Sequence, residues 1–503
     1  MRIFSGIYSK TEKNAVEELL KTFPNNMKVL KLYVSTGDLL KRLNAKTKKE
    51  LLDQNSLTAF ALCSRKPGIS KYIYQNISNN KHYIIYGKTY PTDFPKVNFK
   101  NLNTLNGDYI LLMQKHNDLI LAKDMIGIKQ LYYGENSDLI GFSTIKKQLI
   151  FLDMVPNRLL PGEKLKITKQ GIIKIGRNDI KIQKPKVFDE LKAIKLYKKA
   201  IINSVKERIK NEEKIGVLLS GGVDSTIIAK IVNDLNKNLI CYTAGLPLSN
   251  DIIFSKDIAK ALDLNIKFYK LNPRKIKHLI PELIDTIETW DQFQVENAIP
   301  IYCAMNLATK DNVDVILNGQ GADELFAGYD WYPKILGYDG KKKTNEQMWK
   351  DLQLSYKESF EMQNKLAEFY DLVLCVPYCD RNVIQTAMNI PINLKTINND
   401  EMRKYIHRKL GEELNVPLSS TWREKESAYQ SSGVHKIIKL LAQKLGYLEN
   451  IKYKIQTDFE KLGNIYRYNN KYLPEHEKFG NSFVQSYFED IAQEIGFVEF
   501  TNQ

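Results

Sequence analysis

Short apolar runs separated by polar turns fill the first part of the chain. The runs are rich in Ile, Leu and Tyr, and turn-forming letters such as "KHND" lie between them, which favours β-strands joined in hairpins. The predicted strands are "HYIIYG" (82–87), "DYILLMQ" (108–114), "DLILAK" (118–123), "QLYYG" (130–134), "DLIGFST" (138–144) and "EKLKITKQGIIKIG" (163–176). We therefore expect residues 1–184 to form a domain rich in antiparallel β-structure.

The pattern changes near residue 189. The segment 190–210 carries apolar residues at helical spacing. Beyond it, strand-like and helix-like segments alternate, which predicts an α/β fold with parallel βαβ units and a doubly wound, mostly parallel sheet. The expected strands are 214–220, 239–246, 266–271 and 313–319, and the expected helices are 225–235, 252–264 and 275–290, the last interrupted by Pro281.

The rest of the chain is mostly helical in pattern from about residue 345, and 347–374 is the longest such stretch. We therefore expect a second domain over 189–503, in which a parallel sheet is followed by a helical C-terminal part.

Two glycine-rich loops, "SGGVDS" (220–225) and "GQGADE" (319–324), begin where predicted strands end. Ligands of such sheets gather at the carboxyl ends of the strands, and the amides of a following helix attract anions. A plainer interpretation is that the glycines only turn the chain and that Asp and Ser cap a helix. No lysine stands beside the first loop as in a Walker motif, so phosphate charge would be neutralised by amides, by a metal on Asp224 and by distant cations.

The composition is that of a globular protein of two or three domains, with 503 residues, 43% hydrophobic and 26% charged. No apolar stretch approaches the ~18 residues of a membrane span and the first residues form no signal-peptide core, so we expect a cytoplasmic protein with no membrane partner. The cysteines are scattered, without a Cys-x-x-Cys pair, and are expected to be reduced and mostly buried. They are Cys63, Cys241, Cys303, Cys375 and Cys379.

The net charge of +16, from 74 Lys and Arg against 58 Asp and Glu, would favour contact with RNA or with nucleotides. The other interpretation is lysine spread over solvated faces, as in "KTKKE" (46–50) and "GKKKTNE" (340–346). No run combines clustered Arg with interleaved aromatic residues, as single-strand binders require. We therefore expect no nucleic-acid partner.

The loop "SGGVDS" resembles the pyrophosphate loop of the N-type ATP pyrophosphatases, and "ILNGQGADELFAGYDWY" (316–332) resembles the Gly-Glu-Gly-Ser/Ala-Asp-Glu-Leu-Phe-Gly-Gly-Tyr signature of asparagine synthetases. The resemblance extends to β-lactam synthetases. It implies that ATP is cleaved between its α and β phosphates to adenylate a carboxylate, with ATP and Mg²⁺ as cofactors. Asp224 and Asp323 would be the magnesium ligands, since hard oxygens suit Mg²⁺ that bridges phosphates.

Three downstream segments extend the resemblance: 374–391, "KYIHRKL" (404–410) and "TWREKESAYQSSGV" (421–434). By this match Lys425 is the catalytic cation that stabilises charge on the α-phosphate and the departing pyrophosphate. The alternative for Lys425 is a surface lysine in a charged turn. The match also implies a set of ATP-binding residues, namely Leu219, Ser220, Gly221, Gly222, Asp224, Ser225, Ala244, Asn318 and Gly319.

The N-terminal part resembles the glutaminase domain of asparagine synthetases, an N-terminal-nucleophile fold, through 105–133 and 155–167. The nucleophile of that family is a cysteine whose free α-amino group acts as its base. Ser5 stands at the corresponding position here, behind four further residues, and Tyr86 and Lys88 replace the glutamine-binding Asn and Glu. We therefore expect a degenerate glutaminase-like domain without glutamine hydrolysis.

Gln320 replaces the glutamate of the Gly-Glu-Gly signature, which is implicated in deprotonating the attacking ammonia. A neutral amide cannot take up that proton, and general-base help is typically worth about 10²–10⁴-fold. Gln320 would instead orient ammonia or an amine, with phosphate or water accepting the proton. The sequence does not decide between these routes.

The leading hypothesis is the ligation of aspartate and ammonia to asparagine, with AMP and pyrophosphate as the other products. The alternatives are a lactam or another amide, a tRNA-modifying enzyme with the same ATP loop, and a catalytically silent partner subunit. The intact Asp224, Asp323 and Lys425 speak against the silent subunit. Free ammonium or a separate glutaminase subunit would supply nitrogen, and the sequence leaves a homodimer open.

Overall fold

The computed structural model describes residues 1–11, 13–24, 27–36, 39–43, 56–64, 73–78, 81–90, 105–115, 118–181, 184–235, 238–397, 402–447 and 482–496. The chain divides into two compact units. The first consists of Met1–Ile180 with Glu368–Asp371, and the second of Lys181–Ala367 with Leu372–Val498.

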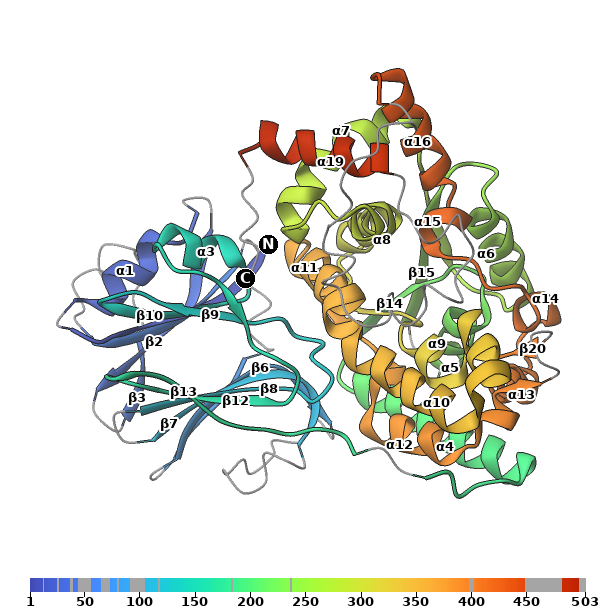
Figure 1. The fold of residues 1–503 in the computed structure, drawn as a ribbon, viewed down its shortest axis with the longest axis horizontal. Coiled ribbons are helices and arrows are strands. Elements are labelled where there is room, and N and C mark those ends of the chain that lie inside the picture. Colours follow the sequence, from blue (N-terminus) through green and yellow to red (C-terminus); the bar gives the residue numbers. More distant parts are fainter. Residues whose placement is uncertain are drawn as a thin grey trace. The chain divides into compact units, whose positions relative to one another are not determined.

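The first unit is built on two antiparallel sheets (Figure 1). The order in one sheet is β11 (Asn157–Arg158), β9 (Tyr132–Glu135), β10 (Leu139–Ser143), β1 (Arg2–Ser9), β4 (Thr58–Ser64), β2 (Lys28–Thr36) and β3 (Leu39–Leu43). The order in the other is β13 (Gly171–Arg177), β12 (Glu163–Thr168), β8 (Asp118–Lys123), β7 (Asn106–Lys115), β6 (Lys81–Tyr90) and β5 (Ile73–Ser78). The predicted β-rich character of this half of the chain is confirmed.

Alternation along β1 shows how the sheets bury their side chains. Phe4 and Tyr8 lie in a core that both sheets share, whereas Ile3 and Ile7 lie in a second core on the other face. The second core is covered by α1 (Ala15–Lys21) and α3 (Lys146–Phe151), which lie over the outer face of that sheet (Figure 1). Since both faces of β1 are covered, the strand is apolar on both faces.

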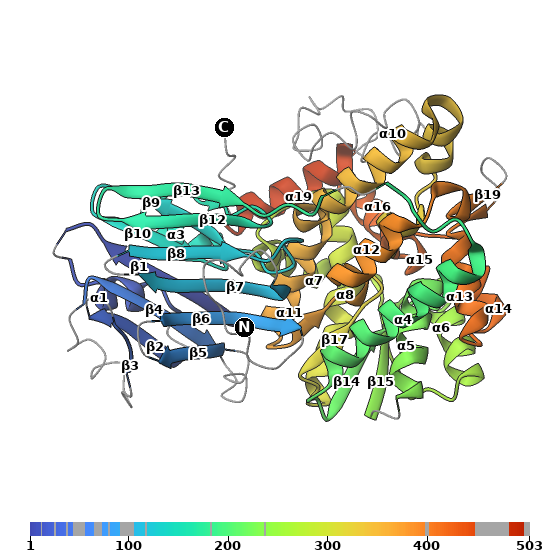
Figure 2. The same cartoon turned by 90° about the horizontal axis from the view of Figure 1, so that it is seen from below.

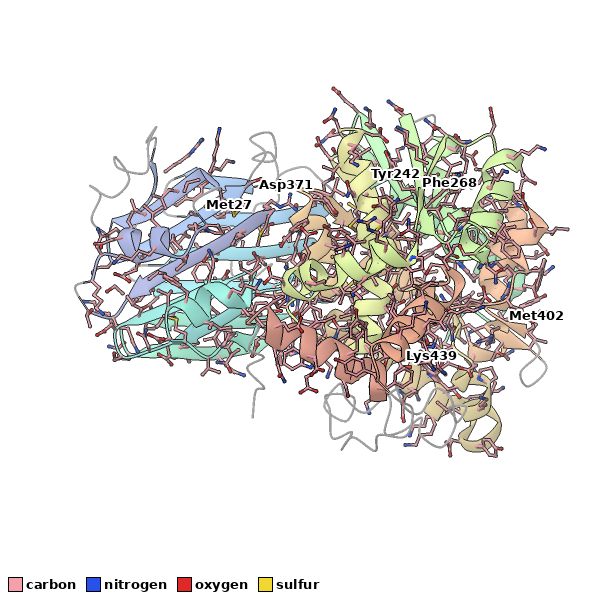
Figure 3. The ribbon with its side chains drawn as sticks, turned by 90° about the horizontal axis from the view of Figure 1, so that it is seen from above. Met27, Tyr242, Phe268, Asp371, Met402 and Lys439 are labelled. Carbon is pink, nitrogen blue, oxygen red and sulfur yellow. The ribbon has the colours of Figure 1, made fainter. Side chains whose placement is uncertain are left out.

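The second unit contains a parallel sheet with strand order β16 (Ile266–Lys270), β15 (Asn238–Gly245), β14 (Lys214–Leu218), β17 (Val315–Leu317) and β18 (Val373–Cys375). Tyr242 and Phe268 lie close together on β15 and β16 (Figure 3). The chain runs outward from β14 to β16 and then returns to the other side of β14. The predicted doubly wound sheet is therefore confirmed, with its switch point between β14 and β17.

The helices between these strands cover both faces of the sheet. Figure 2 shows α5 (Val223–Asp234) and α6 (Asn250–Ala261) on one side, and α7 (Pro273–Ile287) and α8 (Gln292–Lys310) on the other. The predicted interruption at Pro281 is wrong, because α7 continues through it. The buried apolar face of α7 outweighs the cost of one proline, about 3 kcal/mol.

The remainder of the second unit is mostly helical, as predicted. Its elements are α4 (Glu190–Ile209), α9 (Ala322–Phe326), α10 (Trp331–Ser355), the π-helix η3 (Tyr356–Phe360), α11 (Glu361–Phe369), the 3-10 helices η4 (Pro377–Cys379) and η5 (Ile392–Leu394), α12 (Arg381–Asn389), β19 (Thr396–Ile397), β20 (Met402–Arg403), α13 (Tyr405–Glu413), α14 (Leu418–Thr421), α15 (Ala428–Ser431), α16 (Val434–Lys444) and α19 (Ser482–Glu494). Strand β18 begins inside the stretch 347–374, whose pattern predicts helix, and ends one residue beyond it. It is only three residues long and fully buried, so it shows no alternation.

Two further observations concern the described residues. Among them, no helix has both the length and the apolar character that crossing a membrane requires. The five cysteines are buried, as predicted, and none of them takes part in a disulfide.

Candidate active site

The loop between β14 and α5 is shaped by Gly221. This residue has φ +75°, and a Cβ placed on it would lie 2.7 Å from the backbone of Phe254. Only glycine meets both conditions without strain. Gly222 precedes the first turn of α5 and supplies no side-chain cap to it. The loop thus turns tightly and points the uncapped amides of a helix outward, which is the arrangement that attracts anions.

One serine and one threonine hydroxyl brace this loop from inside. Ser225 Oγ accepts a hydrogen bond from the amide of Ser220 at 3.2 Å and donates to the carbonyl of Gly222 at 3.2 Å. Thr226 Oγ1 donates to the same carbonyl at 2.8 Å. The hydroxyls therefore hold the loop closed, so that its shape is set before any ligand arrives.

The second glycine loop, between β17 and α9, packs directly against the first. A Cβ on Gly319 would lie 2.8 Å from Asp224 Cβ and 2.9 Å from the amide of Ser225. Gly321 has φ +94° and allows the chain to enter α9, which carries Asp323. Because β14 and β17 are neighbours, both loops leave the same edge of the sheet at its switch point.

Lys404 joins the carboxylates of the two loops. Its Nζ lies 2.6 Å from Asp224 Oδ2 and 2.7 Å from Asp323 Oδ1, and its side chain is 2% exposed. Lys404 has φ +59° and immediately precedes α13. This backbone conformation is uncommon for a residue with a side chain, and here two ion pairs accompany it.

Lys425 approaches the same carboxylates from a different segment. Its Nζ lies 2.8 Å from Asp323 Oδ2 and 4.0 Å from Asp224 Oδ2, and its side chain is 33% exposed. The predicted catalytic cation is thus next to both predicted metal ligands. Unlike Lys404, it remains accessible from outside the protein.

The charges of this cluster reinforce one another. Burial by itself raises the pKa of Asp224, but Lys404, His407 and Lys425 together hold that pKa well below its usual range. Burial likewise raises the pKa of Asp323, and Lys404 and Lys425 reverse the effect. Burial lowers the pKa of Lys425, while Asp323 and Asp224 raise it above its ordinary value. The two carboxylates and Lys425 are therefore all charged at neutral pH.

Buried aromatic side chains and a histidine hold Asp224 in place. His407 Nε2 lies 3.0 Å from Asp224 Oδ1, and its Nδ1 lies 2.8 Å from the hydroxyl of Tyr197. The ring of Phe326 stacks on His407 with centroids 5.2 Å apart. Tyr378 donates a hydrogen bond of 2.9 Å to the carbonyl of Asp224. These contacts fix the position of the Asp224 carboxylate on the protein side.

Arg423 connects the segment that carries Lys425 to the first glycine loop. Its guanidinium donates to the carbonyl of Ser220 at 2.7 Å and pairs with Glu426 at 3.1 Å. Arg408 in turn donates to the carbonyl of Arg423 at 3.1 Å. Lys425 is thus held beside the loop by its neighbours in the sequence.

Gln320 belongs to a row of side-chain amides. Asn318 donates to Gln363 of α11, and Gln363 Nε2 donates to Gln320 Oε1 at 3.4 Å. Asn318 and Gln363 are buried, whereas Gln320 is half-buried. The Gln320 carbonyl is therefore engaged by Gln363, and its amide N–H₂ faces away from that hydrogen bond.

The remaining predicted nucleotide-binding residues lie at strand ends. Both backbone groups of Leu219 are occupied, since its amide donates to Tyr242 at 3.0 Å and its carbonyl accepts from Thr243. Ala244 is buried on β15. Asn318 is occupied by Gln363. The two glycine loops, Asp323 and Lys425 are thus in contact with one another. Leu219 and Ala244 lie behind them, and a ligand would meet mainly their apolar atoms.

Ser5 lies in the first unit, in the middle of β1. It pairs with Ala61 of β4 and with Ser143 of β10, and its hydroxyl donates to the carbonyl of Phe142 at 3.1 Å. It is 3% exposed. Its backbone nitrogen is a peptide amide and not a free amine. Tyr86, which replaces an expected glutamine-binding residue, stacks on Phe4 with centroids 5.1 Å apart.

The sequence reasoning missed several residues that shape this site. It noted "KYIHRKL" and "TWREKESAYQSSGV" without assigning roles to Lys404, His407 or Arg423, and it did not consider Gln363. A cation was expected from elsewhere in the chain, because the first loop lacks a lysine. That requirement and the match of "KYIHRKL" were the signals that pointed to Lys404.

The carboxylates of Asp224 and Asp323 offer hard oxygen ligands, which suit Mg²⁺. Within the described ranges, no three His, Cys, Asp or Glu side chains gather to hold a metal by themselves. Mg²⁺ typically keeps several waters and binds through one or two carboxylates plus substrate phosphates. The donor set therefore fits an ion that arrives with a nucleotide.

Comparison with known proteins bears on the same residues. The family model for asparagine synthase matches residues 196–343 and 337–447, together half of the chain. A Methanocaldococcus jannaschii protein, named as a glutamine-hydrolyzing asparagine synthetase, is 27% identical over 424 residues, 72% of this chain and 77% of that protein. Asparagine synthetase B of Escherichia coli, also named glutamine-hydrolyzing, is 25% identical over 323 residues. The match covers 61% of this chain but only 57% of the E. coli protein.

Solved structures give weaker likenesses. A glutamine phosphoribosylpyrophosphate amidotransferase from B. subtilis has a TM-score of 0.28 and 13% identity, covering 49% of this chain and 67% of that chain. An NMN synthetase from Francisella tularensis also has a TM-score of 0.28, with 12% identity, covering 62% of this chain and 98% of that chain.

The switch-point loops and the matched family together define an ATP-dependent carbon–nitrogen ligase. The match reaches from α4 through the second glycine loop to α16, and so includes every side chain placed in the cluster around Asp224. The chain belongs to the asparagine synthase family.

Proposed function

We propose that the chain uses Mg²⁺ and ATP to adenylate a carboxylate, most simply that of aspartate, with release of pyrophosphate. Ammonia then attacks the adenylate and forms the amide, with AMP as the other product. One observation carries the proposal: Asp224 and Asp323, from two loops at one edge of the sheet, share the cations Lys404 and Lys425. This arrangement supports a site for a polyphosphate that brings its own metal ion.

The geometry supports different roles for the residues of the cluster. Asp224 and Asp323 would hold Mg²⁺, which when bound neutralises phosphate charge. Gly221, Gly222, Ser220 and Ser225 would receive the phosphates at the start of α5. Leu219, Ala244, Asn318 and Gly319 would line the nucleotide behind this loop.

Lys425 would stabilise the charge that develops on the α-phosphate and on pyrophosphate. It is the accessible lysine of the pair, and a flexible point charge suits a group that must follow moving charge. Lys404 would position Asp224 and Asp323, since it lies between them and is almost fully buried.

Gln320 would orient the nitrogen nucleophile. Its carbonyl accepts from Gln363, so the row of amides holds its N–H₂ group away from that bond. An amide cannot take the proton of ammonia, so phosphate or water would accept it. The reaction would then lack the general-base contribution of about 10²–10⁴-fold.

We further propose that the first unit does not hydrolyse glutamine. A free α-amino group at Ser5 would require removal of Met1–Phe4, yet Arg2, Ile3 and Phe4 pair with β4 and are buried. The amine source is then free ammonium or a separate glutaminase subunit. We also propose that the protein is cytoplasmic and forms a homodimer.

The test is pyrophosphate release from Mg²⁺ and ATP with aspartate, followed with and without ammonium or glutamine. We expect AMP, pyrophosphate and asparagine with ammonium, and no asparagine with glutamine alone. ADP and phosphate as products, or pyrophosphate release that does not depend on aspartate, would overturn the proposed adenylation of aspartate. Glutamine-driven asparagine formation would instead overturn the account of the first unit alone.

A further inference from the structure

The carbonyl of Ser220, at the start of the first glycine loop, is held by a side chain from a distant part of the chain. Arg423 Nη1 donates to this carbonyl at 2.7 Å, and the Arg423 side chain is 7% exposed. The serine and threonine hydroxyls that brace the loop bind other groups, namely the amide of Ser220 and the carbonyl of Gly222. The orientation of the peptide between Ser220 and Gly221 therefore depends on Arg423.

The direction of the Ser220 carbonyl decides the direction of the Gly221 amide. The two groups belong to one planar trans peptide, so the N–H points opposite to the carbonyl. Gly221 is buried, and in the described part of the chain its N–H donates to no acceptor. Buried backbone N–H groups are nearly always paired, so this one favours a ligand that accepts a hydrogen bond. With the carbonyl bound to Arg423, the N–H points away from the guanidinium.

Glycine at position 221 makes this peptide easy to rotate. Gly221 has φ +75°, and glycine populates φ values of either sign about as readily. A half-turn of the peptide would place the carbonyl oxygen on the side toward which the N–H now points. A carbonyl oxygen repels a phosphate, whereas an N–H attracts it. A donor that is fixed to the carbonyl therefore keeps the loop in the form that binds anions.

Helix α6 and a neighbouring glutamate fix the guanidinium of Arg423. Its Nη2 lies 3.5 Å from Oδ1 of Asp251, a residue that is 5% exposed, and 3.1 Å from Oε2 of Glu426. Its Cζ lies 4.2 Å from the centre of the Phe254 ring. Glu426 in turn accepts hydrogen bonds of 2.9 and 3.0 Å from Asn250 Nδ2. Carboxylates and an aromatic ring thus hold the planar, charged guanidinium in one direction.

We propose that Arg423 is a positioning residue for ATP: it fixes the Ser220–Gly221 peptide so that the Gly221 N–H faces the phosphates, and Asp251 holds Arg423 in place. The inference rests on the proposed function in one respect, namely that the phosphates of ATP bind at this loop. Arg423 acts through the peptide and does not touch the nucleotide. It should therefore govern the affinity for ATP, whereas Lys425 would govern the rate of pyrophosphate release.

Binding of a nonhydrolysable ATP analogue is measured by calorimetry on the full chain in the presence of Mg²⁺. Arg423→Met removes the donor and keeps an unbranched side chain. We expect it to weaken binding about tenfold or more, the usual value of a hydrogen bond from a charged group. Glu424→Gln is the matched control, because Glu424 is the exposed next residue of the same segment, and it should bind like the unmodified chain. Equal affinity of Arg423→Met and the unmodified chain would overturn the proposal.

Further readouts separate positioning from a general loss of structure. Arg423→Lys retains a charged donor and should recover part of the affinity, and guanidinium added below denaturing concentrations should strengthen binding to Arg423→Ala but not to Glu424→Gln. In turnover, Arg423→Met should raise the KM for ATP and leave the KM for aspartate unchanged. Rescue by neither route, or an equal rise of both KM values, would contradict the positioning role.

Asp251→Asn tests the same contact from the other side. The substitution keeps the shape of the side chain and removes its charge, so we expect weaker binding of the ATP analogue, as in Arg423→Met. It also serves should Arg423→Met fail to fold. Unchanged affinity in whichever of the two variants folds contradicts the proposal.

The two proposals fail separately. Aspartate-dependent pyrophosphate release with an unchanged KM for ATP in Arg423→Met would reject the role of Arg423 and keep the ligase. Binding of the ATP analogue that depends on Arg423, without aspartate-dependent pyrophosphate release from ATP, would keep the role of Arg423 and reject the ligase.

Discussion

Lys404 and Lys425 contact the same two carboxylates but differ in burial. The Lys404 side chain is 2% exposed and touches both aspartates, whereas the Lys425 side chain is 33% exposed. An accessible ammonium can meet a phosphate, and a buried one between two carboxylates holds them in place. The two lysines should therefore respond differently to the same substitution.

Lys425→Met is expected to fold normally and to lower pyrophosphate release about 10²–10³-fold, the usual cost of one transition-state contact. Lys404→Met is expected to destabilise the fold by about 3–5 kcal/mol, because it removes the buried cation between two carboxylates and leaves them only the half-exposed Lys425 as a shared cation. Thermal unfolding of both variants measures the difference. Millimolar Mg²⁺ should restore more stability to Lys404→Met than to the unmodified chain. Equal melting temperatures for the two variants would contradict the division of roles.

The sequence predicted the members of this cluster only where a motif carried them. Asp224, Asp323 and Lys425 stand in segments whose spacing is recognisable, and the contacts bring them together. Lys404 and Arg423 also stand in matched segments, but the match gave neither of them a partner or a role. Lys404 is 180 positions from Asp224, and Arg423 is 203 positions from Ser220. Such pairs are set by tertiary packing and leave no local pattern.

At the scale of elements, the first glycine loop depends on its two glycines in different ways. Gly221 has φ +75° and would place a Cβ 2.7 Å from Phe254, whereas Gly222 has φ −80° and its nearest neighbour would be Ser220 Oγ at 3.5 Å. Backbone geometry thus requires glycine at 221 but not at 222. A close approach of phosphate to the start of α5 would require it at 222.

Gly221→Ala is expected to lower the melting temperature, since the left-handed conformation alone costs about 1–2 kcal/mol per residue and the contact with Phe254 adds to that. Gly222→Ala is the matched control for folding and should melt like the unmodified chain. It should nevertheless bind ATP more weakly, as measured by calorimetry. Normal ATP affinity in Gly222→Ala would count against phosphate binding at this loop.

The elements that sequence predicted well are those with clear periodicity. The hairpin-rich half and the alternation from β14 to β17 follow from two-residue and helical periods. Strand β18 was missed because three buried residues show no period, and α7 was wrongly interrupted because the burial of Ile276, Ile280 and Ile284 overrides Pro281. Tertiary burial decides such cases, and a local pattern cannot report it.

At the scale of the molecule, one unit carries the ligase site, and the other carries Ser5, the expected nucleophile, in a buried position. Ser5 is buried in the middle of β1, and the residues before it are part of the same sheet. Ile3 and Phe4 lie in the two different cores of that unit. Removing the first four residues would therefore take apart packing on both faces of the sheet.

We therefore expect the mature protein to keep Arg2–Phe4. The intact mass of the purified chain shows whether these residues are retained. Ser5→Ala should leave ammonium-dependent asparagine formation unchanged, and neither form should convert glutamine to glutamate. An N-terminus at Ser5, or glutamate formation that disappears in Ser5→Ala, would show that the unit is a working glutaminase.

The most direct test of the ligase is the exchange of labelled pyrophosphate into ATP with no nitrogen donor present. Adenylation of a carboxylate is reversible, so we expect exchange that requires aspartate and Mg²⁺ and disappears in Asp323→Asn. Asp323→Asn should retain the fold, because the amide has the shape of the carboxylate. Exchange without any acid, or exchange that persists in Asp323→Asn, would contradict the adenylation of a carboxylate at this site.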